Sequence, residues 1–349
     1  MELTTVWFIL IAILWIGYFV LEGFDFGVGI LTRVLARDET ERRLLINTIG
    51  PVWDGNEVWV LVAGGATFAA FPEWYATLFS GFYLPLFLIL LSLIFRNVAF
   101  EYRGKRPEAS WKAWWDRAIF VGSLLPAVLW GVAFGNIVRG VDLDARGEYV
   151  GNVFDLLNPF AILCGFVTLT LFITHGAVFV SLKTTGDIRV RARVLAWKVG
   201  AVAAVLAVTF LAWTYGERSE AEHLGWFTVL ALVAAAALVG ALVAIRAGRE
   251  GWAFLGTAAT LAFAVGALFV ALFPAVMPSS LDPAWSLTTT NASSTPYTLK
   301  IMTWVAVIFT PLVVAYQSWS YIVFRRRIGV QHIPPESTAT DPEPATVTR

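Results

Sequence analysis

Nine long apolar segments, separated by short charged stretches, constrain this chain more than any other feature of its sequence. They cover residues 6–30, 55–71, 75–100, 117–138, 159–182, 195–215, 224–245, 252–276 and 299–324. A helix needs roughly 20 mainly apolar residues to cross the hydrocarbon core of a bilayer. The sequence therefore predicts an all-α, polytopic membrane protein with nine transmembrane helices.

The composition excludes several other classes of protein. The 349 residues are 58% hydrophobic and only 14% charged, whereas soluble domains carry about 25% charged residues. The 16 Trp and 26 Phe residues argue against a disordered chain. Basic and acidic residues balance at 25 each, so the chain lacks the basic excess of nucleic-acid-binding proteins. A single cysteine, Cys164, excludes a disulfide framework and a cysteine-rich metal or iron–sulfur site.

The spans are expected to form two four-helix bundles and one additional helix. Residues 1–138 contain the first four spans, and residues 139–276 contain the second four. A polar external loop over 277–298 precedes the ninth helix at 299–324. The remaining residues, 325–349, are rich in Pro, Ser and Thr, and we expect a disordered cytoplasmic tail there.

Basic residues alternate between the two sides of the predicted bundle. They gather after the first, third, fifth, seventh and ninth spans, at Arg33, Arg37, Arg42, Arg43, Arg103, Lys105, Arg106, Lys112, Lys183, Arg189, Arg191, Arg193, Arg246, Arg249, Arg325, Arg326 and Arg327. Because positive residues mark the cytoplasmic side, the N-terminus is predicted outside and the C-terminus inside. The first span is not expected to be a cleaved signal peptide, because no basic region precedes it.

Charged residues occur inside the first three spans, where placing a charge in the membrane costs free energy. Glu22 and Asp25 lie three residues apart in the first span, as do Asp54 and Glu57 in the second, so each pair shares a helix face. Arg96 lies in the third span. A charge in a spanning helix costs at least ~2.5 kcal/mol and is normally functional. The alternative is a position near the membrane surface, where the acids are solvated and the arginine extends to water.

We interpret these acids as a proton path that opens to the cytoplasm. Asp25 precedes Arg33 by about eight residues, roughly 12 Å of helix, and Asp54 follows the basic cluster at a similar depth. Two acids on adjacent, oppositely directed helices can share a file of water molecules. Trp53 and Asn56 flank this motif and are expected near an interface or cofactor, and Asn56 offers hydrogen bonds to water.

Few residues could ligate a haem iron, which needs His, Met or Cys. His175 is the one histidine inside a span, and we expect it to pack against a neighbouring helix and contact a backbone carbonyl. Met277 falls in the predicted loop, and Met302 falls near the outer end of the ninth span. The chain is therefore expected to bind no metal and no haem by itself.

Seven strings along the chain resemble subunit II of the cytochrome bd-type quinol oxidases. They are GFDFGVG at 23–29, TERRLLINTIGPVWDGNEVWVLVAGGATFAAFP at 40–72, FRNVAFEYR at 95–103, GVAFGN at 131–136, LLNPF at 156–160, FPAVMPSS at 273–280 and MTWVAV at 302–307. The strings follow one another from the first span to the ninth, so the resemblance covers the chain apart from its tail.

The resemblance implies a function that the residues alone do not establish. Complexes of this family lie in the bacterial inner membrane, oxidise a membrane quinol and reduce dioxygen to water. They take the protons for water from the cytoplasm and so generate a proton-motive force. The two b haems and one d haem belong to the partner, subunit I, across a large apolar face. This chain is similar to members that hold a structural quinone, and small accessory subunits could accompany it.

The resemblance also assigns roles to individual residues. Asp25 and Asp54 match acidic positions implicated in proton supply, and Asp116, in the string WWDRAIF, matches a further family acid. Arg96 matches an arginine near the cofactor region. Glu57 stands where some members have glutamine, which weakens the argument for an essential role.

Two other classes of protein fit part of the pattern. A secondary transporter could use helices broken at glycine, with a carboxylate-lined site at mid-depth. The last three of the eight paired spans, however, contain no matching polar break. A purely structural membrane scaffold is the second alternative, and the acid pairs in the first two spans argue against it.

Overall fold

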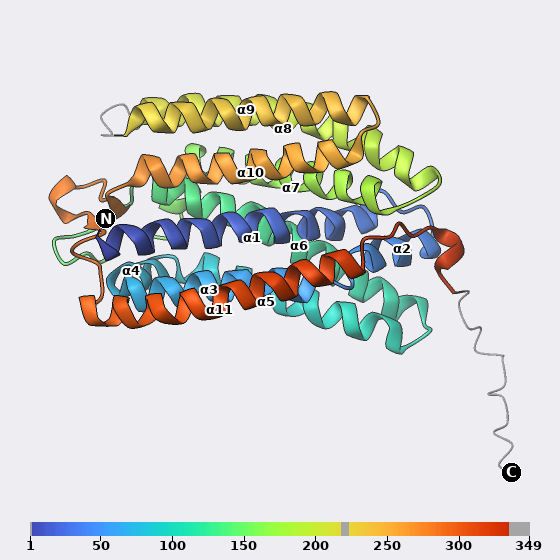
Figure 1. Ribbon diagram of the computed structural model, residues 1–349, viewed down its shortest axis with the longest axis horizontal. Helices are drawn as coiled ribbons and strands as arrows, with labels where there is room; N and C mark the ends of the chain where they lie inside the picture. Colours follow the sequence, from blue (N-terminus) through green and yellow to red (C-terminus); the bar gives the residue numbers. More distant parts are fainter. Residues whose placement is uncertain (1, 218–222, 335–349) are drawn as a thin grey trace, which may run out of the picture.

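A computed structural model describes residues 2–217 and 223–334, which form an elongated bundle of helices lying side by side (Figure 1). The elements in chain order are α1 (Leu3–Val34), α2 (Glu39–Ile49), α3 (Trp53–Ala70), α4 (Pro72–Gly81), α5 (Tyr83–Tyr102), η1 (Arg103–Lys105), α6 (Ala109–Arg139), η2 (Asp155–Leu157), α7 (Pro159–Lys183), α8 (Asp187–Glu217), α9 (Leu224–Arg246), α10 (Glu250–Leu272), β1 (Ala275–Met277), η3 (Pro283–Trp285), β2 (Leu287–Thr288), α11 (Pro296–Val323) and η4 (Val330–His332). We refer to the two ends of the bundle as the α2 end and the β1–β2 end.

Eight helices in the described part of the chain are long and apolar enough to cross a membrane: α1, α5 with η1, α6, α7, α8, α9, α10 and α11. The prediction of an all-α, polytopic membrane protein is therefore confirmed. The predicted span at 55–71 corresponds to α3, which is not among the eight. Its first turns contain Asp54, Asn56 and Glu57, and these polar residues lower its mean hydropathy.

The predicted third span, 75–100, is not one helix. It is divided at Phe82 between α4 and α5, and the start of α4 extends to Pro72. Pro85 lies in the first turn of α5, where the missing backbone N–H is tolerated, whereas further inside a helix it would remove a hydrogen bond. Tyr149 packs against Gly81, so that a Cβ there would lie 2.6 Å from the Cβ of Tyr149. The chain therefore bends at this point around a buried Phe82.

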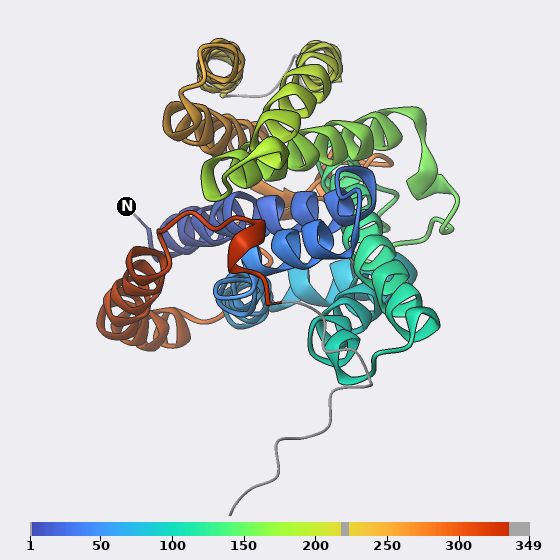
Figure 2. The ribbon, with the colours of Figure 1, turned by 90° about the vertical axis from the view of Figure 1, so that its right-hand side faces the viewer.

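Helix α1 runs through the centre of the bundle and contacts α3, α6, α7 and α10. It packs most intimately on α7, where Gly27 faces Gly176. A Cβ on Gly27 would overlap the carbonyl oxygen of Phe172 and lie 2.8 Å from the Cα of Gly176. Glycines thus allow the two backbones to touch, as is common between membrane helices. Viewed from the α2 end, Figure 2 shows α11 at the edge of the bundle, where it contacts α1 and α3.

The predicted external loop at 277–298 is partly ordered structure. Helix α10 ends at Leu272, shortly before Pro274, and strand β1 then pairs antiparallel with β2. A bridge between Val141 and Ser279 joins this segment to the chain after α6. The loop therefore covers one end of the bundle rather than extending from it.

The predicted tail also begins with ordered residues. The backbone N–H of Ile328 donates to the carbonyl of Lys183 at 2.9 Å, and Arg43 donates to the carbonyl of Pro334 at 2.8 Å. Ile333 is buried against α2 and its neighbours. Burial of apolar side chains such as Ile333 offsets the conformational entropy that ordering this segment costs. The rest of the predicted tail, 335–349, lies outside the described residues.

Candidate functional site

The centre of the candidate site is a buried ion pair between two helices. Glu22 of α1 and Arg96 of α5 are both fully buried, and Arg96 Nη1 pairs with Glu22 Oε1. The Arg96 guanidinium also lies over the rings of Phe26 and Phe100, at 4.9 and 5.5 Å from their centroids. These contacts compensate the cost of removing both charges from water. Arg96 therefore does not extend to the membrane surface.

Asp25 occupies the same buried region and contacts a different helix. Asn56 Nδ2 of α3 donates to Asp25 Oδ2 at 2.7 Å. The side-chain oxygen of Asn56, Oδ1, accepts from Tyr321 Oη at 2.7 Å and from Gln317 Nε2 at 3.1 Å, both on α11. Gln317 is held in turn by Trp59 Nε1, which donates to Gln317 Oε1 at 2.8 Å. Since two donors face its oxygen, the Asn56 amide directs its N–H groups toward Asp25.

Several polar atoms around this pair are buried and have no hydrogen-bond partner in the described protein. They are Glu22 Oε2, Asp25 Oδ1, Glu57 Oε2, Asn97 Oδ1, and Nε and Nη2 of Arg96. A buried polar group without a partner costs about 1–3 kcal/mol. These atoms come from α1, α3 and α5, and together they form a polar region that can accept water molecules or exchangeable protons.

The two acids of α3 differ in their positions relative to Asp25. Glu57 is half-buried and accepts a hydrogen bond from Asn97 Nδ2 of α5 at 2.8 Å, while Asp54 is exposed. Residues 54 and 56 differ by about 200° around a helix, so Asp54 faces outward when Asn56 faces Asp25. The structure therefore does not bring Asp25 and Asp54 into one buried site, contrary to the predicted shared water file.

Trp53 lies beside the outward-facing acids. Its ring packs on Phe100 with 5.2 Å between the ring centroids, and the side chain is half-buried. Phe100 is one of the rings under the Arg96 guanidinium. Trp53 is thus linked to the buried pair by packing.

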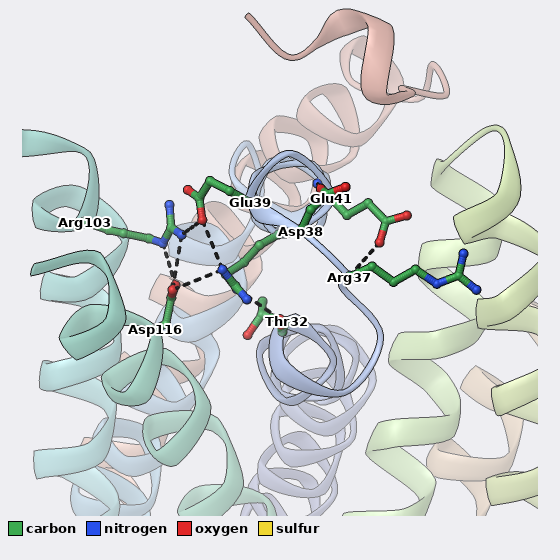
Figure 3. Close-up of polar contacts among 8 residues, drawn as sticks. Thr32, Arg37, Asp38, Glu39, Glu41, Arg103 and Asp116 are labelled. Atoms are coloured by element: carbon green, nitrogen blue, oxygen red, sulfur yellow. Dashed lines mark hydrogen bonds and ion pairs between the residues drawn. The ribbon is translucent and has the colours of Figure 1, made fainter. Parts of the chain in front are cut away.

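Asp116 belongs to a separate cluster at the α2 end, shown in Figure 3. Its carboxylate accepts from Arg103 Nε at 2.6 Å and lies 3.6 Å from Arg42 Nη1. The same two arginines contact Glu39 Oε2, at 2.7 Å from Arg103 and 3.1 Å from Arg42. Two acids and two arginines therefore balance within one network, which joins α2 to η1 and α6.

The two arginines of this cluster lower the pKa of the Glu39 carboxyl. Partial burial alone would raise the pKa of the Glu39 carboxyl, but the hydrogen bonds and positive charges of Arg103 and Arg42 outweigh it. The pKa of Glu39 is lowered from its ordinary value of 4.5 as a result.

Gln317, Tyr321 and Asn97 belong to the site but were not predicted from the sequence. An amide inside an apolar segment was the available signal for Gln317, because such residues commonly bond across membrane helices. Glu39 was not predicted as a site residue either, and Arg42 and Arg103 were predicted only to mark the cytoplasmic side. Their pairing depends on how α2 lies against α5 and α6, which the spacing of charges does not encode.

His175 is engaged at both ring nitrogens. Nδ1 contacts Thr257 Oγ1 at 2.7 Å and Nε2 contacts the carbonyl of Val20 at 3.0 Å, while the ring stacks on Phe254. The predicted contact with a backbone carbonyl is present. A histidine occupied in this way does not fit the role of an axial haem ligand. No group of three or more His, Cys, Asp or Glu within 2–217 and 223–334 could hold a metal ion.

The fold and the site together define an integral membrane protein with a charge network buried inside its bundle. A family model described as cytochrome bd terminal oxidase subunit II matches residues 3–324. The chain belongs to this family, as the resemblance of its motifs predicted.

Proteins of known name support the assignment. The chain is 46% identical over 329 residues to cytochrome bd ubiquinol oxidase subunit 2 of Bacillus subtilis, covering 94% of this chain and 97% of that protein. It is 40% identical over 362 residues to cytochrome bd-I ubiquinol oxidase subunit 2 of Escherichia coli, covering 94% and 96%. A chain of the bd oxidase from Geobacillus thermodenitrificans shares the fold, with a TM-score of 0.75 at 17% identity, covering 93% and 99%. These similarities do not favour a secondary transporter.

We expect the Glu39 network to stabilise the protein in a pH-dependent way. Because the folded-state pKa of Glu39 lies below 4.5, its stabilising contribution is present above that value and is lost as pH falls through the folded pKa. Glu39→Gln should therefore lower the thermal midpoint at pH 7, and the difference from the wild type should shrink as the pH falls below 4.5. The measurement is the melting of the purified complex across this range, with Glu148→Gln, at an exposed carboxylate, as control. An identical decrease at every pH would contradict this account.

Proposed function

We propose that this chain supplies part of the route by which protons reach the oxygen-reducing centre of a quinol oxidase. In this proposal the complex oxidises a membrane quinol and reduces dioxygen to water, as the names of the relatives suggest. The observation that carries the proposal is the fully buried Glu22, Asp25 and Arg96 cluster within helices of membrane length. Charges at this depth are normally functional, because they are costly to insert.

The proposed route uses the unpartnered atoms of the buried cluster. Water bound at Asp25 Oδ1 and Glu22 Oε2 would connect two carboxyl groups that can each take up and release a proton. Arg96 stabilises the negative charge of Glu22 through an ion pair, and Asn56 positions the Asp25 carboxylate through a hydrogen bond. Protons would enter from the α2 end, where the basic residues gather.

Glu57 and Asp54 would act at the surface where the chain meets its partner. Glu57 is half-buried between α3 and α5, and Asp54 is exposed beside it. Leu61 lies seven residues after Asp54, on the same face of α3, and is exposed, as are Phe87 and Ile94 of α5. An exposed acid within an apolar face is unfavourable against lipid and favourable against protein. We infer that this face contacts haem-bearing subunit I, and that Asp54 passes protons into the interface.

Asp116 has a structural role in this proposal. Its carboxylate pairs with Arg103 and lies near Arg42, so that it joins α6 to η1 and α2. The network thereby fixes α2 at the side where protons enter.

The family's haems, two of type b and one of type d, would be held by subunit I. His175 is occupied at both nitrogens, so the described residues of this chain do not fit them. The redox chemistry therefore belongs to the partner in this proposal, and small accessory subunits could complete the complex.

A structural quinone fits a cavity toward the β1–β2 end. This cavity, of about 310 Å³, is lined mainly by apolar side chains from α3, α4, α5 and α6. Trp74 lines it, and its indole Nε1 is buried with no hydrogen-bond partner in the described protein. Apolar walls with one free donor suit a quinone ring, whose carbonyl oxygen accepts a hydrogen bond.

We also propose that α3 is the ninth membrane span. Its 18 residues correspond to about 27 Å, close to the thickness of a bilayer core. The polar residues of its first turns meet α1, α5 and α11 rather than lipid alone. With nine spans the N-terminus lies outside and the α2 end lies in the cytoplasm, in line with the basic residues there.

A reporter that fluoresces only in the cytoplasm tests this topology. Fused after Arg349 it should be bright. Fused before Met1 through an added membrane span it should also be bright, because that span places the reporter in the cytoplasm when Met1 lies outside. A dark, well-expressed C-terminal fusion would contradict nine spans and the proposed orientation.

Asp25→Asn tests the proton route. Asn is nearly isosteric, so the complex should assemble with full haem content, yet its oxygen uptake should fall at least about tenfold, because proton transfer typically contributes this much or more. Quinol-driven oxygen uptake, normalised to haem, is the measurement. Glu148→Gln removes an exposed carboxyl and should leave the rate unchanged.

Two outcomes of that measurement would be decisive. Near-normal rates in Asp25→Asn, in Glu22→Gln and in the double variant would end the proton-route proposal. Loss of haem from Asp25→Asn would make Asp25 a determinant of assembly instead.

Trp74→Phe tests the quinone site. The variant keeps an aromatic ring in the cavity wall but removes the free N–H. The purified complex should then contain at least about threefold less quinone per haem, because the quinone loses one hydrogen bond. Trp130→Phe is the matched control, since Trp130 lines the same cavity but donates to Tyr18 Oη at 3.1 Å. Equal quinone content in Trp74→Phe and the wild type would contradict the site.

A further inference from the structure

A second cavity, of about 280 Å³, lies at the α2 end between segments far apart in the sequence. It is bordered by the end of α2, the ends of α7 and α11, and the first turns of α10. Three cationic residues line it: Lys183, Arg325 and Arg327. Its other walls include the rings of Phe179, Phe254 and Phe324. Positive charge thus converges on a pocket with an aromatic wall.

Lys183 is half-buried and has no acidic partner among residues 2–217 and 223–334. Its ammonium group donates to the carbonyl oxygens of Phe324 and Arg326. These neutral acceptors satisfy its hydrogen bonds but leave its charge uncompensated. A partly buried cation without an opposite charge is unfavourable, so the surroundings favour an anion.

The remaining charges near the cavity do not supply that anion. Glu250 pairs with Arg327 of the cavity wall at 3.6 Å, and it is shared with Arg189 at 2.8 Å and Arg193 at 3.8 Å. One carboxylate therefore faces three guanidinium groups. Arg325 is exposed and makes no ion pair within the described part of the chain. The region retains an excess of positive charge around the cavity.

The general enrichment of basic residues on the cytoplasmic side explains part of this pattern. It accounts for cations on exposed connections, where water screens them. It does not explain why cations from α7 and from the segment after α11 line one cavity, or why one of them is withdrawn from water. Aromatic walls beside the charges add a requirement for a ligand that is partly apolar.

We propose that this cavity binds the phosphate group of an anionic phospholipid from the leaflet at the α2 end. Lys183 and Arg325 contact the phosphate oxygens, since ammonium and guanidinium groups are strong donors to phosphate. Basic pockets between membrane helices at this level are suited to anionic headgroups. The apolar, exposed surface of α11, with Leu312, Tyr316 and Trp319, provides contact for an acyl chain. A free phosphate ion would make no use of the aromatic walls or of α11.

The test uses the complete complex, stripped of lipid by repeated detergent exchange and then incubated with phosphatidylglycerol or phosphatidylcholine. We expect native mass spectrometry to detect one tightly retained phosphatidylglycerol and at least fivefold less phosphatidylcholine. Lys183→Gln with Arg325→Gln should reduce phosphatidylglycerol retention at least fivefold, and Lys183→Arg should restore it relative to Lys183→Gln. The double variant Lys198→Gln with Arg246→Gln removes the same charge elsewhere on the cytoplasmic side and should retain lipid like the wild type.

Three results would overturn the proposal. The first is equal phosphatidylglycerol retention in the Lys183 and Arg325 double variant and the wild type. The second is equal retention of phosphatidylcholine, which would show that charge does not select the ligand. The third is displacement of the lipid by millimolar inorganic phosphate at unchanged detergent, which would identify a free anion as the occupant. Haem content and quinol oxidation, measured in parallel, establish that each variant is assembled, so the outcome is independent of the proposed proton route.

Discussion

The pairing of Glu22 with Arg96 inside an apolar bundle is the interaction on which the rest of the site depends. Both side chains are fully buried, so removing either would leave an uncompensated charge at a cost of about 3–5 kcal/mol. The pair therefore fixes the rotation of α1 against α5, and with it the direction in which Asp25 points. Asn56, Gln317 and Tyr321 then extend the polar contacts through α3 to α11. A peripheral helix thereby contributes to the position of a central carboxylate.

Helix α2 connects η1 and α6 with α8 at the end where the cationic residues gather. On one side Glu39 and Arg42 join Arg103 and Asp116, and on the other Glu41 pairs with Arg191 of α8. The segment after α11 covers α2 and ends with Ile333 buried beside it. Figure 3 shows the contacts on the first of these sides, from Glu39 to Arg103 and from Arg103 to Asp116. These ion pairs matter together because a network loses less side-chain entropy per contact than isolated surface pairs.

Polar and apolar functions are separated along the bundle. The charged cluster, the α2 network and the cationic cavity lie toward the α2 end, whereas the apolar cavity beside Trp74 lies toward the other end. This separation follows from the charges at the start of α3 and the end of the first membrane helix. Charged side chains are buried in one half of the bundle, while the cavity beside Trp74 in the other half is lined mainly by apolar side chains.

The sequence by itself determined the class of protein, the positions of most of the long apolar helices and the family. Those properties depend on local hydropathy and on strings such as GFDFGVG and WDGNEVW, which need no knowledge of packing. It also identified Glu22, Asp25, Asn56 and Arg96, because polar residues stand out within apolar spans. Only the tertiary structure decided which of them meet. Asp25 and Asp54 looked equivalent in the sequence, yet the rotation of α3 buries Asn56 and exposes Asp54. Asp116 pairs with arginines brought by η1 and α2, and Gln317 reaches Asn56 from 261 residues away, because helix contacts depend on rotation and crossing rather than on spacing along the chain.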